Sequence, residues 1–239
     1  MQNINNKVAL ITGGSKGIGY GVAEVLMAEG MNVAITSRTQ TAADEAAAKL
    51  NKKGKGNAVG IVCDVRNYES QQESVRQTIE KFGQIDLLFA NAGLGHFASI
   101  EDMSEEQWNE TIDTNLSGVF FSIKAALAEL KKSKGFIITL SSLAGTNFFP
   151  KGAAYNASKF GLTGFTQSVM LDLRQYGIRV STIMPGSVAT HFNGNEPDER
   201  DAWKIQPEDI GEMVVGLLKL NSRTLPSKIE VRPSMPPSK

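Results

Sequence analysis

The segment Val8-Ala9-Leu10-Ile11-Thr12-Gly13-Gly14-Ser15-Lys16-Gly17-Ile18-Gly19 decides the fold of this chain. Its first four residues are apolar and partly β-branched, which is typical of a strand buried on both faces of a parallel sheet. Gly13, Gly17 and Gly19 follow with the spacing G-x-x-x-G-x-G and open a helical stretch. Such a turn brings backbone amides and a helix N terminus close to a pyrophosphate. The segment therefore predicts dinucleotide binding; a turn that only connects strand to helix is the alternative.

Short apolar runs alternate with longer amphipathic stretches along the rest of the chain. The apolar runs predict strands at 8–11, 33–35, 59–62, 85–89, 136–140, 180–183 and 228–231. Helical periodicity predicts helices at 17–30, 40–52, 67–82, 104–131, 153–175 and 207–220. Strict alternation predicts one α/β domain with a doubly wound, parallel seven-stranded Rossmann sheet and helices on both faces.

Local signals mark two helix starts and the chain ends. Ser104 followed by Gln107 predicts a capping box, and Pro207 suits the first turn of a helix. No linker or repeat divides the chain, so residues 1–239 are expected to form a single NAD(P)-binding Rossmann domain. Residues 1–6 and the proline-rich residues 233–239 are expected to fray.

Composition excludes several classes of function. The 239 residues carry a formal net charge of +0, which argues against nucleic acid or anionic membrane as a partner. No apolar run approaches the roughly 20 residues that span a bilayer, and residues 1–6 lack signal-peptide features. The single cysteine, Cys63, cannot form an internal disulfide, so a cytoplasmic location is expected. His96 and His191 lie far apart without a cysteine partner, so no metal site is expected.

The end of the second predicted strand indicates which dinucleotide is bound. An acidic residue there would accept hydrogen bonds from the adenosine ribose of NAD, but this chain has Ser37 and Arg38. Arg38 can pair with a 2′-phosphate, and Lys16 in the glycine turn is placed to approach the same group. Two cations without a carboxylate favour NADP(H). The alternative is that Arg38 is a solvated surface cation.

Tyr155 and Lys159 form a candidate acid–base pair. Four residues apart on a helix, they share one face, so the phenol and the ammonium point into the same space. A free phenol has a pKa of about 10, and a cation beside it lowers that pKa. The pair is therefore a candidate proton donor and acceptor. The other three of the four tyrosines, Tyr20, Tyr68 and Tyr176, lack a lysine at this spacing.

Taken in order, the motifs of the chain resemble those of the short-chain dehydrogenase/reductase family, in its compact NADP(H)-preferring form. The resemblance covers nearly the whole chain and rests on Thr12–Gly19, Asp64, Asn91-Ala92-Gly93, Asn115, Ser142, Tyr155-x-x-x-Lys159 and Pro185-Gly186-x-Val188-x-Thr190. It implies a cofactor site built from Gly13, Ser15, Lys16, Gly17, Ile18, Gly19, Ser37, Arg38, Asp64, Val65, Asn91, Ala92, Gly93, Tyr155, Lys159, Pro185, Gly186, Val188 and Thr190.

The resemblance also implies catalytic roles for Asn115, Ser142, Tyr155 and Lys159. Tyr155 would exchange a proton with the substrate oxygen, and Ser142 would hydrogen-bond that oxygen. Lys159 would lower the pKa of Tyr155 and bind the nicotinamide ribose, and Asn115 would hold a water that links Lys159 to solvent. Ser142 precedes Tyr155 by thirteen residues, as in the family, which favours it over its neighbour Ser141.

The sequence says less about the residues that would contact the substrate. The polar segment 190–206 is expected to act as a lid. Candidate pocket walls are Leu94, His96, Phe97, Leu143, Asn147, Phe148, Phe192 and Trp203, and their phenylalanines suggest an apolar or aromatic ketone. The chain lacks the glycine-rich C-terminal segment of many relatives, which argues against a close match to the fatty-acid-synthesis reductases.

Three functional hypotheses follow. The first is NADPH-dependent reduction of a ketone or 3-oxoacyl-type carbonyl group, and the second is the same chemistry run mainly as alcohol oxidation. The third is a non-catalytic NADP(H)-binding sensor or scaffold, which the intact Ser142, Tyr155 and Lys159 argue against. Relatives assemble through the helices that hold Asn115 and Tyr155, so a homodimer or homotetramer is expected.

Overall fold

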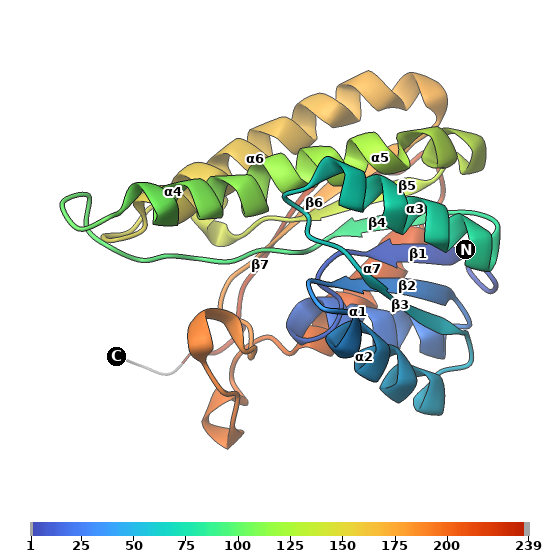
Figure 1. Ribbon diagram of the computed structural model, residues 1–239, viewed down its shortest axis with the longest axis horizontal. Helices are drawn as coiled ribbons and strands as arrows, with labels where there is room; N and C mark the ends of the chain where they lie inside the picture. The colour runs from blue at the N-terminus through green and yellow to red at the C-terminus, as the bar shows by residue number, and fades with distance from the viewer. Residues whose placement is uncertain (1, 237–239) are drawn as a thin grey trace.

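Seven parallel strands form one sheet in the order β3-β2-β1-β4-β5-β6-β7 in the computed structural model, which describes residues 2–236 (Figure 1). The strands are β1 (Val8–Ile11), β2 (Asn32–Ser37), β3 (Ala58–Val62), β4 (Leu87–Ala90), β5 (Phe136–Leu140), β6 (Arg179–Pro185) and β7 (Lys228–Val231). The central strands are buried along their whole length, which explains why they are apolar on both faces. The predicted doubly wound sheet is confirmed.

Two helix layers cover the two faces of this sheet (Figure 1). One layer consists of α1 (Gly17–Ala28), α2 (Gln40–Lys53) and α7 (Pro207–Lys219). The other consists of α3 (Tyr68–Phe82), α5 (Gly118–Ser133) and α6 (Ala153–Leu173), with α4 (Glu105–Ile112) packed beside α6. Each layer has its own core, in which helix side chains such as Leu26 and Leu130 pack against the sheet.

Local sequence signals at the helix ends behave as predicted. Ser104 and Gln107 form the expected capping box at the start of α4. Pro207 lies in the first turn of α7, where its missing N–H leaves no helical hydrogen bond unmade.

The helical stretch predicted over 104–131 is confirmed over Glu105 to Ser133, but it is not one regular α-helix. It is interrupted by a π-helical segment, Asp113–Ser117, between α4 and α5. This segment spans only five residues between two longer α-helices, and the sequence pattern did not indicate it. Asn115 lies in this segment and is fully buried.

The expected fraying of residues 1–6 does not apply to residues 2–6. Ile4 is buried in the core, Gln2 N donates to Lys219 O, and Asn6 N donates to Gly30 O. These contacts hold the N-terminal segment against the helix layer of α1 and α7. Of the C-terminal expectation, residues 237–239 lie outside the described part of the chain.

The chain reverses its winding direction between β1 and β4, which pair in register with Ile11 opposite Phe89. Ligands of doubly wound sheets bind outside the carboxyl ends of the strands at such a point. Here the glycine turn follows β1, and Asn91 follows β4. No helix within residues 2–236 has the length and apolarity needed to cross a bilayer.

We expect Gly60→Ala to destabilise the protein, because a Cβ at this position of β3 would lie 2.4 Å from the carbonyl carbon and oxygen of Ala43 in α2. Helix and strand would have to separate, and we expect the free energy of unfolding to fall by about 1–3 kcal/mol. Urea denaturation followed by circular dichroism measures the change.

Gly216→Ala in α7 is the matched control, because a Cβ there would meet nothing within 4 Å. In a helix interior this change is expected to raise stability by roughly 0.5–1 kcal/mol. Equal effects of the two substitutions would contradict the close packing of α2 on β3.

Candidate active site

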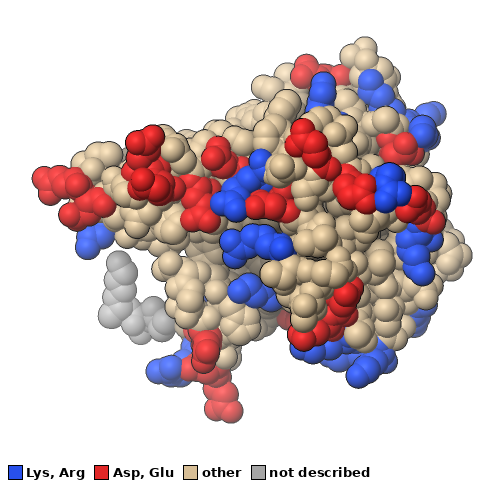
Figure 2. Space-filling model, in the orientation of Figure 1, with Lys and Arg blue, Asp and Glu red and all other residues tan. Residues whose placement is uncertain are grey.

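A cavity of about 920 Å³ lies along the carboxyl edge of the sheet. Every predicted cofactor residue except Gly19 lines it, and so does Ser142. Figure 2 shows basic side chains in the middle of this face, between the two helix layers, and acidic side chains along the arm that carries α4. The structure thus brings residues from the ends of five strands, β1, β2, β3, β4 and β5, together with residues that follow β6, into one site.

The glycine turn is shaped by close approach and by left-handed backbone. Gly13 and Gly17 have φ values of 64° and 59°, which favour glycine. A Cβ at Gly19 would lie 2.6 Å from Asn91 Nδ2, so glycine at this position allows the side chain of Asn91 to pack against the helix. No side chain caps the N terminus of α1, which leaves its first amides free for an anionic ligand.

Asn91 supports this turn from the neighbouring strand. Its Nδ2 donates to the carbonyl oxygens of Thr12 and Gly13 at 2.8 and 3.0 Å. In the opposite direction, the hydroxyl of Thr12 accepts from the backbone N–H groups of Asn91 and Ala92 at 3.0 and 3.1 Å. These four contacts join the loops after β1 and β4 into one unit.

Three cations line the far end of the cavity: Lys16, Arg38 and Lys49. None of them makes a salt bridge with another described residue, so their charges are available to a ligand. Asp44, the carboxylate nearest to Arg38 in sequence, accepts from Gln40 and does not line the cavity. Lys49 and Glu45, which do line it, come from α2 and carry no sequence motif that would single them out.

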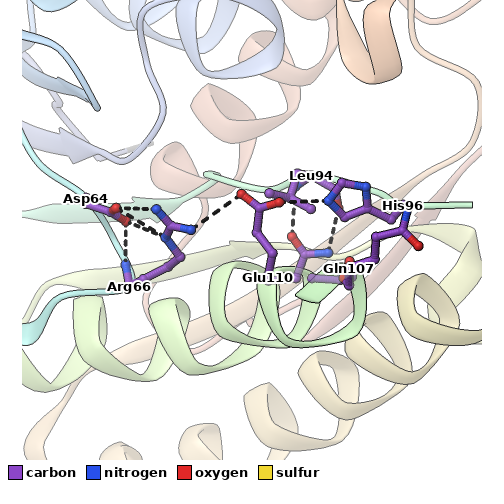
Figure 3. Close-up of polar contacts among 8 residues, drawn as sticks. Asp64, Arg66, Leu94, His96, Gln107 and Glu110 are labelled. Atoms are coloured by element: carbon purple, nitrogen blue, oxygen red, sulfur yellow. Dashed lines mark hydrogen bonds and ion pairs between the residues drawn. The ribbon is translucent and has the colours of Figure 1, made fainter. Parts of the chain in front are cut away.

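Asp64 is engaged by a neighbouring arginine (Figure 3). Arg66 Nη2 donates to Asp64 Oδ2 at 2.7 Å, and Arg66 Nε donates to Oδ1 at 3.0 Å. Hydrogen bonds from Arg66 lower the pKa of the Asp64 carboxyl, and the more distant charge of Arg38 lowers it further. Arg66 also approaches Glu110 of α4 at 3.4 Å, and Glu110 Oε2 lies 2.8 Å from His96 Nε2. The sequence did not reveal this chain of charges.

Asn115 holds the loop that follows β4 (Figure 3). Its Oδ1 accepts from Leu94 N at 2.9 Å, and its Nδ2 donates to Leu94 O at 2.8 Å and to Ser158 Oγ at 3.0 Å. The π-helical turn aims this buried side chain at the loop. The water contact that the family resemblance implies for Asn115 stays a prediction.

Lys159 is buried, and Tyr155 beside it is partly buried. Lys159 Nζ donates to Leu140 O at 2.9 Å and lies 5.7 Å from the centre of the Tyr155 ring. Burial lowers the pKa of Lys159 to about 8. Burial also raises the pKa of the Tyr155 phenol, and a hydrogen bond with Ser142 partly offsets that rise. The sequence predicts a lowered phenol pKa, but in the structure burial raises the pKa of Tyr155, and the Lys159 ammonium donates to the carbonyl oxygen of Leu140.

The two adjacent serines have different environments. Ser141 is buried, and its hydroxyl lies 2.9 Å from Thr163 Oγ1 and donates to Lys159 O at 3.2 Å. Ser142 lines the cavity, where its hydroxyl is hydrogen-bonded to the Tyr155 phenol, accepts from Ala144 N at 3.1 Å and makes a long contact of 3.5 Å to Pro185 O. This arrangement agrees with the choice of Ser142 over Ser141 as the residue that meets a substrate.

The segment 190–206 borders the same cavity. Its two ends are tied by backbone hydrogen bonds between Ala189 and Ile205 and between Ile205 and Ser187, at 2.9 and 3.1 Å. Between these ties it contains two short 3₁₀ turns, Phe192–Gly194 and Glu199–Asp201. Of the expected pocket walls, Leu94 and Phe192 line the cavity. Closure of this segment as a lid stays a prediction.

No cluster of three potential metal ligands occurs within residues 2–236. The residues described above form an open helix N terminus, a group of cations, and a tyrosine with a serine and a lysine beside it. Such a set can hold a phosphate-bearing ligand and exchange a proton with a substrate oxygen.

Comparison with known proteins identifies the family. The family described as short chain dehydrogenase matches residues 7–201. A trans-4-hydroxycyclohexanecarboxylate dehydrogenase of Sinomonas cyclohexanicum is 36% identical over 226 residues, covering 90% of this chain and 86% of the relative. The 3-oxoacyl-[acyl-carrier-protein] reductase FabG of Escherichia coli is 37% identical over 212 residues, covering 88% and 85%.

A solved structure agrees over almost the whole fold. An alcohol dehydrogenase from the archaeon Thermococcus sibiricus, complexed with 5-hydroxy-NADP, superimposes with a TM-score of 0.90 and 31% identity. The match covers 98% of this chain and 99% of the archaeal one. The chain belongs to the short-chain dehydrogenase family of oxidoreductases.

Proposed function

We propose that the protein is an NADPH-dependent reductase that converts the carbonyl group of a ketone or 3-oxoacyl-type substrate into an alcohol. One observation carries the proposal: Ser142, Tyr155 and Lys159 border the same cavity as the glycine turn and three unpaired cations. A nucleotide bound along this edge would place its reactive end beside the phenol. The relatives named as dehydrogenases and reductases of alcohol and carbonyl groups support this reaction class.

The cavity fits an NADP(H) molecule by its chemistry as well as its size. The open N terminus of α1 and the left-handed glycines suit the pyrophosphate. Arg38, Lys16 and Lys49 at the far end suit a 2′-phosphate, because a doubly charged anion needs cations that are not already paired. The archaeal relative with 5-hydroxy-NADP lends further support.

The bound cofactor would supply the hydride, and the protein would supply proton handling and orientation. The Tyr155 phenol donates its proton to the carbonyl oxygen as that oxygen gains negative charge. The Ser142 hydroxyl donates a hydrogen bond to the same oxygen and stabilises the charge. Lys159 would bind the nicotinamide ribose and return a proton to Tyr155, with Asn115 holding the adjacent loop in place.

The pKa shifts favour reduction over oxidation. A phenol whose pKa is raised by burial stays protonated at neutral pH, and a proton donor is what carbonyl reduction requires. Alcohol oxidation would need the phenolate instead. Oxidation remains the second candidate because one of the relatives is named as a dehydrogenase of a hydroxy compound. No residue of the site favours a non-catalytic sensor or scaffold in the same way.

Assembly is proposed from the outer faces of two helices. Phe120 of α5 and Phe160 and Leu171 of α6 are large apolar side chains that remain exposed. The family resemblance implies contacts between subunits through these two helices, so we propose a homodimer or homotetramer. A small-molecule substrate and a cytoplasmic location complete the proposal, the latter because a single buried cysteine suits a reducing compartment.

Arg38→Gln is expected to weaken use of NADPH selectively. Loss of a charged hydrogen bond to a phosphate reduces kcat/KM for NADPH by roughly 10- to 100-fold and leaves kcat/KM for NADH nearly unchanged. Steady-state rates with both cofactors at a fixed ketone concentration measure this. Arg223→Gln, which lies outside the cavity, is the control. Equal losses with NADPH and NADH would contradict a 2′-phosphate contact.

Tyr155→Phe is expected to lower kcat by roughly 10²- to 10⁴-fold, because the substrate oxygen loses its proton donor. The dissociation constant of NADPH, measured by fluorescence titration, should change little. Tyr176→Phe at an exposed site is the control and should behave as the wild-type protein. If Tyr155→Phe kept the wild-type rate, the enzymatic role would be refuted.

The pH profile should report the charge of Lys159. Its pKa of about 8 in the cofactor-free chain means that the ammonium is lost as pH rises through this value. We therefore expect kcat/KM for NADPH to fall above pH 8. Tyr155 does not contribute to this fall, because its pKa lies above the ordinary value.

Lys159→Arg tests the assignment of that fall. A guanidinium stays charged to far higher pH, so the variant should show no decline between pH 7 and roughly 10, even if its absolute rate is lower. A decline at the same pH in both proteins would assign the titration to another group.

A further inference from the structure

Phe97 and Phe192, from separate segments, flank the ring of Tyr155, and Phe149 packs against Phe97. The ring centres of Phe97 and Phe192 lie 5.4 and 5.7 Å from that of Tyr155. Phe97 also packs against Phe192 at 6.4 Å and against Phe149 at 6.0 Å. We call Phe97, Phe149 and Phe192 the phenylalanine clasp.

We propose that the phenylalanine clasp binds an aromatic ring attached to the carbonyl carbon of the substrate, which makes the protein a reductase of neutral aryl ketones. This inference rests on the proposed function and names the substrate class of the same site. A carbonyl oxygen in contact with the Tyr155 phenol places the substituents of the carbonyl carbon within a few ångströms of that ring. The side chains around the ring therefore decide which substituents are accepted.

The angles between the rings favour an aromatic guest. The pairs are tilted by 41° to 57° or nearly T-shaped at 71°, so ring edges face ring planes. The edge of an aromatic ring carries partial positive charge and its face partial negative charge, and such arrangements gain energy beyond buried area. An aryl group can join this pattern, whereas a saturated ring of the same size gains only the burial of apolar surface.

Two glycines make room for the clasp. A Cβ at Gly95 would lie 2.8 Å from Cζ of Phe97 and 3.0 Å from Cζ of Phe192. A Cβ at Gly152 would lie 2.6 Å from Cε2 of Phe149. The meeting of the rings therefore depends on the absence of side chains at two further positions in the loops around the site.

Part of the clasp is held rigidly and part lies on a looser segment. The loop of Phe97 is fixed on both sides of Gly95, because Asn115 binds both backbone groups of Leu94 and Glu110 binds His96 (Figure 3). Phe192 lies instead in the segment 190–206, where its main chain is held only by local contacts to Thr190 and Asn195. A guest ring can thus enter against a fixed wall while Phe192 adjusts.

The clasp keeps apolar surface in contact with solvent. Phe97 is 36% exposed and Phe149 is 43% exposed, although both pack against other rings. Burying this surface under a substrate ring is favourable by the hydrophobic effect as well as by ring contacts. Phe148, the neighbour of Phe149, is 86% exposed and takes part in none of the ring pairs among the described residues, which makes it the natural control.

The test compares acetophenone with cyclohexyl methyl ketone, which share one carbon skeleton and differ in the aromaticity of the ring. For each protein the ratio of kcat/KM for the two ketones is measured with saturating NADPH. Phe97→Leu and Phe192→Leu are expected to lower the ratio, in favour of the saturated ketone, by roughly three- to tenfold. Phe148→Leu is expected to leave the ratio at the wild-type value.

Phe97→Tyr keeps a ring at the same place and should retain the wild-type ratio, which separates loss of the ring from general damage to the loop. Thermal unfolding confirms that each variant is folded. An unchanged ratio in both leucine variants, or wild-type turnover of aliphatic ketones without turnover of acetophenone, would overturn the aryl ketone assignment and leave the reductase intact. No turnover of any ketone by the wild-type protein would instead overturn the proposed function and the clasp with it.

Discussion

Two backbone N–H groups at the end of β4 donate to a single hydroxyl at the end of β1, and the site depends on this contact. Thr12 accepts from Asn91 and Ala92, and Asn91 returns two hydrogen bonds to the glycine turn. The winding of the sheet reverses between these two strands, so their loops would otherwise diverge. The contact instead keeps the glycine turn and the loop that follows β4 together at one edge of the cavity.

A second constraint is the burial of charge and polarity beside the tyrosine. Lys159 is 4% exposed, and its ammonium donates a hydrogen bond to the carbonyl oxygen of Leu140. The side-chain amide of Asn115 likewise forms hydrogen bonds with the backbone of Leu94 and the hydroxyl of Ser158. Buried polar groups need partners, and each partner fixes the position of a loop that borders the cavity. Lys159 and Asn115 therefore also hold the walls of the site.

Much of this was predictable from sequence because the strongest signals are local. Each apolar run became a strand of one parallel sheet, and most motif residues follow strand ends, whereas Asn115, Tyr155 and Lys159 lie on helices. What sequence could not predict depends on contacts between distant segments. The short π-helical turn at Asn115 was not indicated by the sequence pattern, and the ion pair between Arg66 and Asp64 depends on side-chain geometry. The pKa of Tyr155 likewise depends on burial, which the spacing to Lys159 does not encode. The gathering of Phe97, Phe149 and Phe192 joins loops more than forty residues apart.

We propose that one cavity holds the nicotinamide and the carbonyl group together, so that hydride passes directly between them while Tyr155 provides the proton. The most direct test uses NADPH carrying two deuterium atoms at C4 of the nicotinamide, with mass spectrometry of the alcohol formed. Direct transfer predicts one deuterium atom bound to the carbinol carbon, irrespective of which face of the nicotinamide reacts. An alcohol whose carbinol hydrogen comes from solvent would contradict it.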